Sequence, residues 1–168
     1  MIAIIGATGK VGSQTTEHLL KAGKNVLLIA RKEDELRPYQ NRGAEIAVGS
    51  ASDTHFLSEA LKGADIVLTM IPADLNSPDI KSHQDKIGEA TIAAIKSAGI
   101  KHVVNLSSVG GHTEENTGIV AGLARQEIRL NALEGVNVLH LRPTSFMENY
   151  FSNIPIKKQR NSGLGAST

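Results

Sequence analysis

Residues 1–12 read Met1-Ile-Ala-Ile-Ile5-Gly6-Ala-Thr8-Gly9-Lys-Val-Gly12, and a helix-like segment follows over residues 13–22. The order is an apolar strand, a glycine turn and a helix. Glycines at a three-residue repeat let the backbone turn tightly, approach a pyrophosphate closely and start a helix whose free N–H groups face the anion. This stretch therefore predicts a dinucleotide site, in which Thr8 donates a hydroxyl hydrogen bond and Gly12 lets the helix pack against the strand. A purely structural turn is the alternative interpretation.

The composition is that of one globular domain with an ordinary core, because 40% of the 168 residues are hydrophobic and the net charge is +1. A nearly balanced charge gives no reason to expect direct nucleic-acid binding. The absence of cysteine excludes a disulfide framework and a thiolate metal site, and we expect no metal. No apolar run approaches the roughly 20 residues that span a bilayer, and a start directly in a core strand leaves no room for a signal peptide. We therefore expect no membrane partner and a cytoplasmic location.

Short apolar runs alternate with amphipathic segments along the rest of the chain. Beyond the first, the predicted strands cover residues 26–30, 45–48, 66–70, 103–106 and 136–141. The predicted helices include residues 55–61, 82–98 and 121–133, each closed by a nearby glycine. Strands that alternate with helices over short connections predict an α/β fold with a doubly wound parallel sheet in three layers, α/β/α. The ligand of such a sheet lies beyond the carboxyl ends of the strands.

Arg31 and Lys32 follow the second predicted strand, at about the 20-residue distance where the fingerprint places an acidic residue for a ribose 2′-hydroxyl. A guanidinium pairs with a 2′-phosphate through charge-assisted hydrogen bonds, whereas a carboxylate would repel it. The sequence therefore favours NADP over NAD as the cofactor. The alternative interpretation is that Arg31 is a solvated loop charge.

Three later segments resemble the NmrA-like family of atypical short-chain dehydrogenases/reductases. They are residues 103–112, 122–127 and above all 137–149, where Leu-Arg-Pro-x-x-Phe-Met-Glu-Asn over 141–149 is the most specific motif. The resemblance covers nearly everything from Met1 to about Lys158. It implies an NAD(P)-binding Rossmann fold. Members of the family include NADPH-dependent quinone oxidoreductases and isoflavone-type reductases, together with NmrA itself, a dinucleotide-binding transcriptional co-regulator without evident turnover.

The resemblance also implies the parts played by individual residues toward the cofactor. The pyrophosphate would be held by the glycine loop, namely Gly6, Thr8, Gly9, Lys10, Val11 and Gly12. Arg31 would meet the 2′-phosphate, Met70, Ile71 and Pro72 would lie along the adenosine ribose, and Ser107, Pro143 and Thr144 would border the nicotinamide. One departure stands out. Related enzymes often have Gly-Asp after the third strand, but this chain has Gly49-Ser50, and Asp53 is interpreted as the N-cap of the next helix.

The catalytic residues are harder to assign, because the Tyr and Lys pair that short-chain dehydrogenases use for proton transfer is not in the sequence. Tyr39 and Tyr150 are its two tyrosines, and neither has a lysine four residues later. Ser107 stands where a strand-end serine is expected. His112 follows in a glycine-bearing loop and could act as a general acid, since histidine is the side chain that ordinarily exchanges protons near neutral pH. The alternatives are that Ser107 satisfies backbone groups and that His112 is a solvated loop residue.

Residues 1–150 are expected to form the dinucleotide-binding domain, and residues 151–168 a helix start and mobile tail that leave the substrate region short or missing. An uncovered sheet edge would favour a homodimer. The residues Asp79, Lys81, His83 and Asp85 are interpreted as a solvated loop and helix start rather than a metal site. Two functions remain open. One is an NADPH-dependent oxidoreductase that passes hydride to a small electrophile such as a quinone, and the other is a non-catalytic NADP(H)-binding redox sensor.

Overall fold

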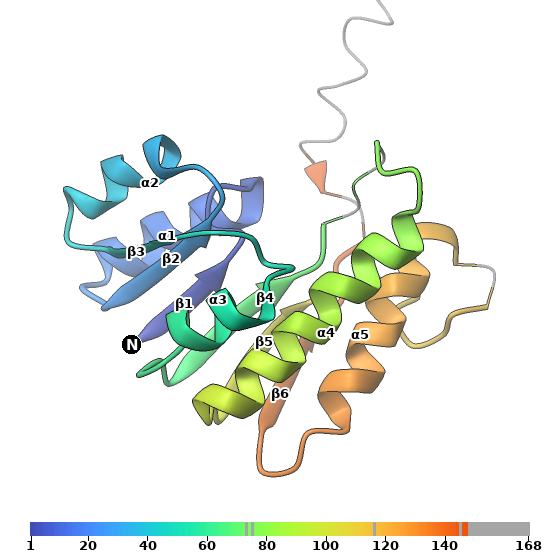
Figure 1. Ribbon diagram of the computed structural model, residues 1–168. Helices are drawn as coiled ribbons and strands as arrows, with labels where there is room; N and C mark the ends of the chain where they lie inside the picture. Colours follow the sequence, from blue (N-terminus) through green and yellow to red (C-terminus); the bar gives the residue numbers. More distant parts are fainter. Residues whose placement is uncertain (73, 75, 116, 145, 148–168) are drawn as a thin grey trace, which may run out of the picture.

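The computed structural model describes residues 1–72, 74, 76–115, 117–144 and 146–147, and it consists of a parallel sheet with helices on both faces (Figure 1). The strands are β1 (Ile2–Ile5), β2 (Val26–Ala30), β3 (Glu45–Val48), β4 (Ile66–Met70), β5 (His102–Leu106) and β6 (Asn137–Leu141). The helices are α1 (Lys10–Lys21), α2 (Glu33–Gln40), α3 (Thr54–Ala60), α4 (Ile80–Ala98) and α5 (Ala121–Asn131), with a short 3₁₀ turn at Gly118–Val120.

All neighbouring strands of the sheet are parallel, in the order β3-β2-β1-β4-β5-β6. The order reverses between β1 and β4, so the chain leaves the sheet in opposite directions after these two neighbours. This doubly wound arrangement opens a crevice at the carboxyl ends of β1 and β4. The fold class predicted from the sequence, a Rossmann-type α/β sheet, is confirmed.

Two hydrophobic clusters lie on the two faces of the sheet. On one face, apolar residues of α3, α4 and α5, such as Leu57, Ile95 and Leu130, pack against alternate strand residues that include Ile5 and Val67. On the other face, α1 and α2 cover the side chains that point the opposite way from β1 and β2. The alternation follows from the strand geometry, in which successive side chains point to opposite faces.

The second helical layer covers only part of its face. The strand register aligns two apolar rows across β4, β5 and β6, namely Leu68, Val104 and Leu139, then Met70, Leu106 and Leu141. Within the described residues no helix packs over the β6 end of these rows, and the side chains of Leu139 and Leu141 are 57% and 43% exposed. The sheet is therefore fully covered on one face and half covered on the other.

The predicted elements are all present, and their ends differ by a few residues. α1 starts three residues earlier than predicted, because Gly9 is its N-cap and the Ser13 N–H already donates to the Gly9 carbonyl at 2.8 Å. The interpretation of Asp53 is confirmed, since its carboxylate accepts a hydrogen bond from the Phe56 N–H at 3.0 Å and caps α3. Gly99 ends α4 at a φ of 68°, a left-handed conformation that glycine adopts without strain.

None of the described helices is both long and apolar enough to cross a membrane. Residues 151–168, to which the sequence analysis assigned a helix start and mobile tail, lie outside the described residues, as does Tyr150. The division of the chain at residue 150 stays a prediction.

Candidate functional site

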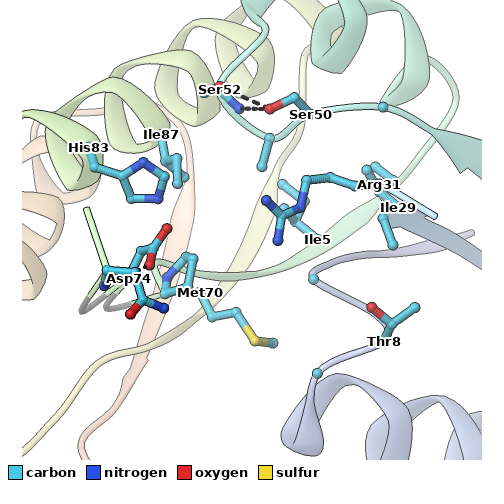
Figure 2. Close-up of a pocket in the computed structure, with 17 residues that line it drawn as sticks. Ile5, Thr8, Ile29, Arg31, Ser50, Ser52, Met70, Asp74, His83 and Ile87 are labelled. Carbon is cyan, nitrogen blue, oxygen red and sulfur yellow. Dashed lines mark hydrogen bonds between the residues drawn. The ribbon is translucent and has the colours of Figure 1, made fainter. Parts of the chain in front are cut away.

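A cavity of about 550 Å³ lies at the carboxyl ends of β1 to β4 (Figure 2). Its walls come from the glycine loop after β1, from the ends of β2 and β3, from the segment after β4 and from the first turns of α4. The lining residues are Ile5, Gly6, Thr8, Gly9, Ile29, Ala30, Arg31, Gly49, Ser50, Ala51, Ser52, Met70, Pro72, Asp74, Asn76, His83 and Ile87. The cavity thus occupies the crevice that the strand order creates.

The glycine loop has the geometry that a pyrophosphate requires. Gly6 has a φ of 81°, and its carbonyl accepts the Gly9 N–H at 3.1 Å, which closes a tight turn. A Cβ on Gly12 would overlap the Gly6 carbonyl and come within 2.9 Å of the Ala7 Cα, so only glycine lets α1 approach β1 this closely. No side chain caps the start of α1. Its first-turn N–H groups are therefore free of side-chain acceptors, as anion binding demands.

Arg31 lies at the end of β2, and its guanidinium points into the cavity (Figure 2). No ion pair to Arg31 is found within the part of the chain that the structure describes. Ser50 and Ser52 face it from the end of β3, with their hydroxyl oxygens 2.9 Å apart. This edge of the cavity therefore presents the Arg31 guanidinium and two hydroxyl groups. Ser50 occupies the position at which related enzymes often have an aspartate.

The far wall includes His83, which the sequence analysis assigned to a solvated loop and helix start, together with residues that it did not single out. Asp74, Asn76, His83 and Ile87 line it, from the segment after β4 and from α4. Nothing in the sequence separated His83 from its solvated neighbours. Of the three predicted ribose contacts, Met70 and Pro72 line the cavity and Ile71 is buried beside it. Lys10, Val11 and Gly12 are not among the lining residues.

The predicted catalytic and nicotinamide residues lie outside this cavity, after β5 and β6. Ser107 is 5% exposed, and its hydroxyl makes no hydrogen bond of good geometry within the described residues. The Val109 N–H donates to the Pro143 carbonyl at 2.9 Å, so Pro143 holds the loop that contains both Ser107 and His112. The side chains of His112 and Thr144 are exposed. The structure brings Ser107, His112 and Pro143 into one loop region and separates them from the cavity.

A buried carboxylate beneath this loop was missed by the sequence analysis. Glu127 of α5 is 3% exposed, and the Arg142 guanidinium pairs with both of its oxygens, with Nε donating to Oε1 at 2.9 Å. Burial alone would raise the pKa of Glu127, but the hydrogen bonds from Arg142 outweigh it and place the pKa below its usual range. A Cβ on Gly111 would meet the Ser107 hydroxyl and come within 2.8 Å of the Glu127 carboxylate. The loop can rest on Glu127 only because residue 111 is glycine.

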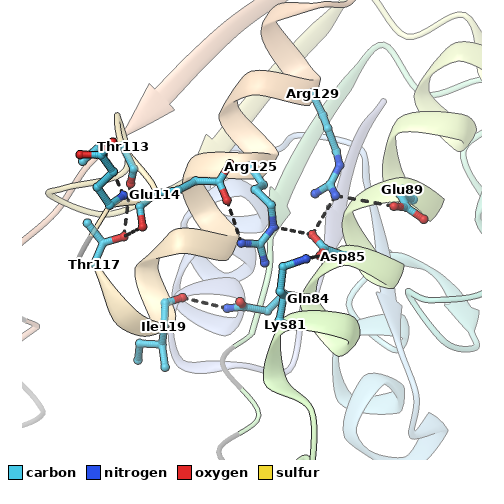
Figure 3. A network of polar contacts seen from close by, with 11 residues as sticks. Lys81, Gln84, Asp85, Glu89, Thr113, Glu114, Thr117, Ile119, Arg125 and Arg129 are labelled. Atoms are coloured by element: carbon cyan, nitrogen blue, oxygen red, sulfur yellow. Dashed lines mark hydrogen bonds and ion pairs between the residues drawn. The ribbon is translucent and has the colours of Figure 1, made fainter.

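A second polar network joins α4 to α5 (Figure 3). Asp85 accepts from the Arg125 Nε at 2.6 Å and from the Arg129 Nη2 at 2.7 Å, and Lys81 adds a third contact at 3.0 Å. Burial would raise the pKa of Asp85, but these three cations hold it well below its usual range. The interpretation of residues 79–85 as a solvated segment is therefore wrong at Asp85, whose side chain is 16% exposed because two arginines of α5 cover it. No group of acidic and histidine residues able to hold a metal is found in the described ranges.

Comparisons with known proteins agree with this geometry. The chain is 30% identical over 155 residues to a (4-alkanoyl-5-oxo-2,5-dihydrofuran-3-yl)methyl phosphate reductase of Streptomyces griseus, across 92% of this chain and 51% of that protein. It is 26% identical over 172 residues to quinone oxidoreductase 2 of Escherichia coli K12, across 99% of this chain and 56% of that protein. The chain thus spans about half the length of the curated relatives it matches.

A solved NADPH-dependent quinone oxidoreductase from Escherichia coli, complexed with NADPH, superimposes with a TM-score of 0.81 at 22% identity, over 96% of this chain and 55% of that one. This likeness shows the shared fold. A family model described as NAD(P)H-binding matches residues 6–149, which include the glycine loop, the cavity and the loops after β5 and β6. The resemblance to the NmrA-like reductases agrees with that match, and the chain belongs to the NAD(P)H-binding family.

Proposed function

We propose that the chain binds NADPH in the cavity at the carboxyl ends of β1 to β4 and passes hydride to a small electrophile such as a quinone. The observation that carries this proposal is the Arg31 guanidinium, which lines the cavity together with the glycine loop and makes no ion pair within the described residues. The similarity to quinone oxidoreductase 2 of Escherichia coli supports the choice of acceptor.

The residues present fit such a cofactor. The glycine loop offers uncapped N–H groups at the start of α1, and Gly12 leaves the close approach that any side chain would fill. We propose that Gly6, Thr8, Gly9, Lys10, Val11 and Gly12 hold the pyrophosphate, that Arg31 binds the 2′-phosphate, and that Met70, Ile71 and Pro72 contact the adenosine ribose. Ser107, Pro143 and Thr144 would border the nicotinamide. When bound, NADPH supplies the hydride, and the protein supplies position and electrostatics.

The protein groups proposed for the reaction are Ser107 and His112. The buried Ser107 hydroxyl has no hydrogen-bond partner among the described residues, and it would gain a hydrogen bond from a polar group of the ligand. His112 is exposed in the loop that follows Ser107 and would donate the proton that a reduced quinone needs.

A non-catalytic NADP(H) sensor is the second candidate. It is favoured by one observation, which is that neither Ser107 nor His112 lines the cavity. A chain of this kind would bind the adenosine half of the cofactor without holding a substrate at its reactive end.

A paired titration of the purified chain with NADPH and NADH, followed by cofactor fluorescence, tests the binding. Arg31→Ala is expected to weaken NADPH by about 1.5 to 3 kcal/mol, the range for a hydrogen bond to a charged group, and to leave NADH nearly unchanged. Equal loss for the two cofactors would contradict the role of Arg31. Addition of a quinone at the end of each titration separates the two candidates, because NADPH oxidation supports the reductase and binding without oxidation supports the sensor.

Beyond the dinucleotide, we propose a small-molecule electron acceptor and a second copy of this chain as partners. The proposal of a second copy is supported by the edge strand β6, because Leu139 and Leu141 are exposed on one of its faces. The cytoplasmic location stays a prediction.

A further inference from the structure

Two serines lie next to Arg31 at the edge of the cavity formed by the ends of β2 and β3. The Gly49 N–H donates to the Ala30 carbonyl at 3.0 Å, which continues the parallel pairing of the two strands one residue beyond β3. Because neighbouring strands lie about 4.8 Å apart, Arg31 and the loop after Gly49 leave the sheet side by side. Ser50 and Ser52 of this loop line the same cavity as Arg31 (Figure 2).

The loop that carries the two serines is fixed by contacts outside the cavity. A Cβ on Gly49 would come within 2.6 Å of the Phe56 ring, so the backbone of the loop lies directly on this ring. The Asp53 N–H donates to the Ser50 carbonyl at 3.0 Å and closes a turn, and the Asp53 carboxylate caps α3. These contacts place the serines before a ligand binds, which reduces the entropy that binding would otherwise cost.

The serine pair keeps a hydroxyl proton for a ligand. The Ser50 and Ser52 hydroxyl oxygens are 2.9 Å apart, so one hydroxyl donates to the other, and the Ser52 N–H donates to the Ser50 Oγ at 3.3 Å. Two hydroxyls have two protons, and the mutual hydrogen bond uses one of them. The second proton is available to an acceptor in the cavity.

The charges along this edge favour an anion as that acceptor. Asp74 is the one carboxylate among the described residues that line the cavity, and it follows β4, two strands away from β2 in the sheet. Asp53 comes directly after the serines, but its carboxylate accepts from the Phe56 N–H at 3.0 Å and is not part of the cavity lining. The lining residues at the ends of β2 and β3 therefore combine a guanidinium with hydroxyl donors. A phosphate accepts from both kinds of group.

From these contacts we infer that Ser50 and Ser52 are specificity-determining residues, which complete a 2′-phosphate site together with Arg31. The inference rests on the proposed function, because it concerns the same cofactor in the same cavity. Arg31 supplies the positive charge, and the serine pair donates a hydroxyl proton to the phosphate. NADH has a neutral hydroxyl in place of the phosphate, and it gains less from the same donor because hydrogen bonds to charged groups are the stronger ones.

Replacement of both serines by alanine tests the donation. The readout is the ratio of the dissociation constants for NADH and NADPH, measured by titration of the full chain. In the double variant Ser50→Ala, Ser52→Ala we expect this ratio to fall about fivefold, the difference between a hydrogen bond to a charged acceptor and one to a neutral acceptor. Serines that only shape the loop would change both constants together and leave the ratio alone.

Ser58→Ala is the matched control for the loss of a hydroxyl. Ser58 belongs to α3, the helix that follows the loop, where its hydroxyl donates to the Thr54 carbonyl at 2.7 Å. It is not among the residues that line the cavity. The ratio is expected to stay unchanged in this variant, and a fall as large as that of the double variant would overturn the inference.

A charge placed at residue 50 tests where the phosphate binds. Ser50→Asp brings a carboxylate to the position beside Arg31, and we expect it to lower the ratio about tenfold by repulsion of the 2′-phosphate. Ser50→Asn is its control, because asparagine has nearly the same shape without the charge, and it should change the ratio far less. Equal effects of the two substitutions would overturn the inference, since the size of the side chain would then set the ratio.

Two further outcomes separate this inference from the proposed function. An unchanged ratio in the double alanine variant or in Ser50→Asp, with both cofactors still bound, would overturn the inference alone. Binding of NADH by each variant also shows that the variant is folded. If the unmodified chain bound neither cofactor, the proposed function would fail and the inference with it.

Discussion

The buried Glu127 carboxylate lies beside the Ser107 hydroxyl, which we propose to contact a ligand. The carboxylate of Glu127 is buried and fixed by Arg142, and the Ser107 hydroxyl lies beside it under the loop of residues 108–112. A buried hydroxyl without a well-formed hydrogen bond costs free energy, which a ligand group can recover. Within the described residues the Ser107 hydroxyl makes no hydrogen bond to a backbone group. We interpret Glu127 as the support on which this loop rests.

Substitution of the two proposed catalytic residues is expected to separate turnover from binding. His112→Ala should lower kcat for NADPH-dependent quinone reduction about a hundredfold, the lower range for loss of a general acid, without a change in the dissociation constant for NADPH. Ser107→Ala should also lower kcat, since the hydroxyl borders the proposed nicotinamide position. Ser108→Ala is the neighbouring control. Steady-state kinetics and cofactor titration make the comparison, and full turnover in His112→Ala would remove histidine from the mechanism.

At the scale of elements, α4 and α5 are joined by charge as well as by apolar packing. Asp85 of α4 holds Arg125 and Arg129 of α5, and Arg125 also reaches Glu114 in the preceding loop at 3.2 Å (Figure 3). Arg125 is thereby engaged away from the cavity, so it takes no part in the proposed site. The network instead fixes the helix that carries Glu127, and through it the loop after β5.

Loss of Asp85 is expected to destabilise the fold in a pH-dependent way. Asp85→Asn removes the carboxylate that the two partly buried guanidinium groups share and leaves them only the more exposed Glu114 and Glu89, which should lower the free energy of unfolding by about 3 kcal/mol at pH 7. The folded-state pKa of Asp85 is lowered, so its contribution is present above the unfolded value of about 3.9 and is lost as the pH falls below it. The difference between the two proteins should therefore shrink below about pH 4.

Urea unfolding at several pH values measures this difference. Glu89→Gln is the control, because Glu89 is exposed and contacts Arg129 only at 3.6 Å, and it should have little effect. A pH-independent difference between the Asp85→Asn variant and the unmodified protein would contradict the assignment of charge to Asp85.

The strands and helices could be predicted from the sequence because their signals are local. The glycine loop, the Asp53 cap and the apolar face of α4 each depend on residues a few positions apart, and each is found as expected. The pairs that join distant segments could not be predicted in this way. Glu127 with Arg142 and Asp85 with Arg125 meet only after the sheet has formed, and His83 lines the cavity because α4 places it there.

The whole molecule has one complete helical layer and one partial layer. The apolar rows that end at Leu139 and Leu141 lie at the edge of the sheet, where no strand of the described residues pairs with the outer side of β6. Such an edge is a template for a second strand. Two copies that pair β6 with β6 would form a symmetric interface, in which the same surface of each copy meets the other.

Light scattering coupled to size-exclusion chromatography tests this association. The unmodified chain is expected to elute as a dimer, and Leu139→Lys should shift it to a monomer because a charge would enter the interface. Ile128→Lys is the control, since Ile128 is equally exposed but belongs to α5 on the other face. A monomer in the unmodified chain at tens of micromolar would contradict the homodimer.

The strand order also sets how firmly each loop is anchored. β1 lies inside the sheet, between β2 and β4, and the glycine loop follows it directly, whereas Ser107 follows β5, one strand from the open edge. Resistance to local opening falls from the interior of a sheet toward its edges, so amide protons of β1 should exchange with solvent far more slowly than those of β6. A dinucleotide bound across this sheet would have its phosphates at the loop after the interior strand β1, which resists local opening most. Its nicotinamide ring would lie near the loop after β5, where the sheet opens more readily. The chain would thus hold the phosphates of its cofactor in a fixed position, while the nicotinamide ring would keep some freedom to move.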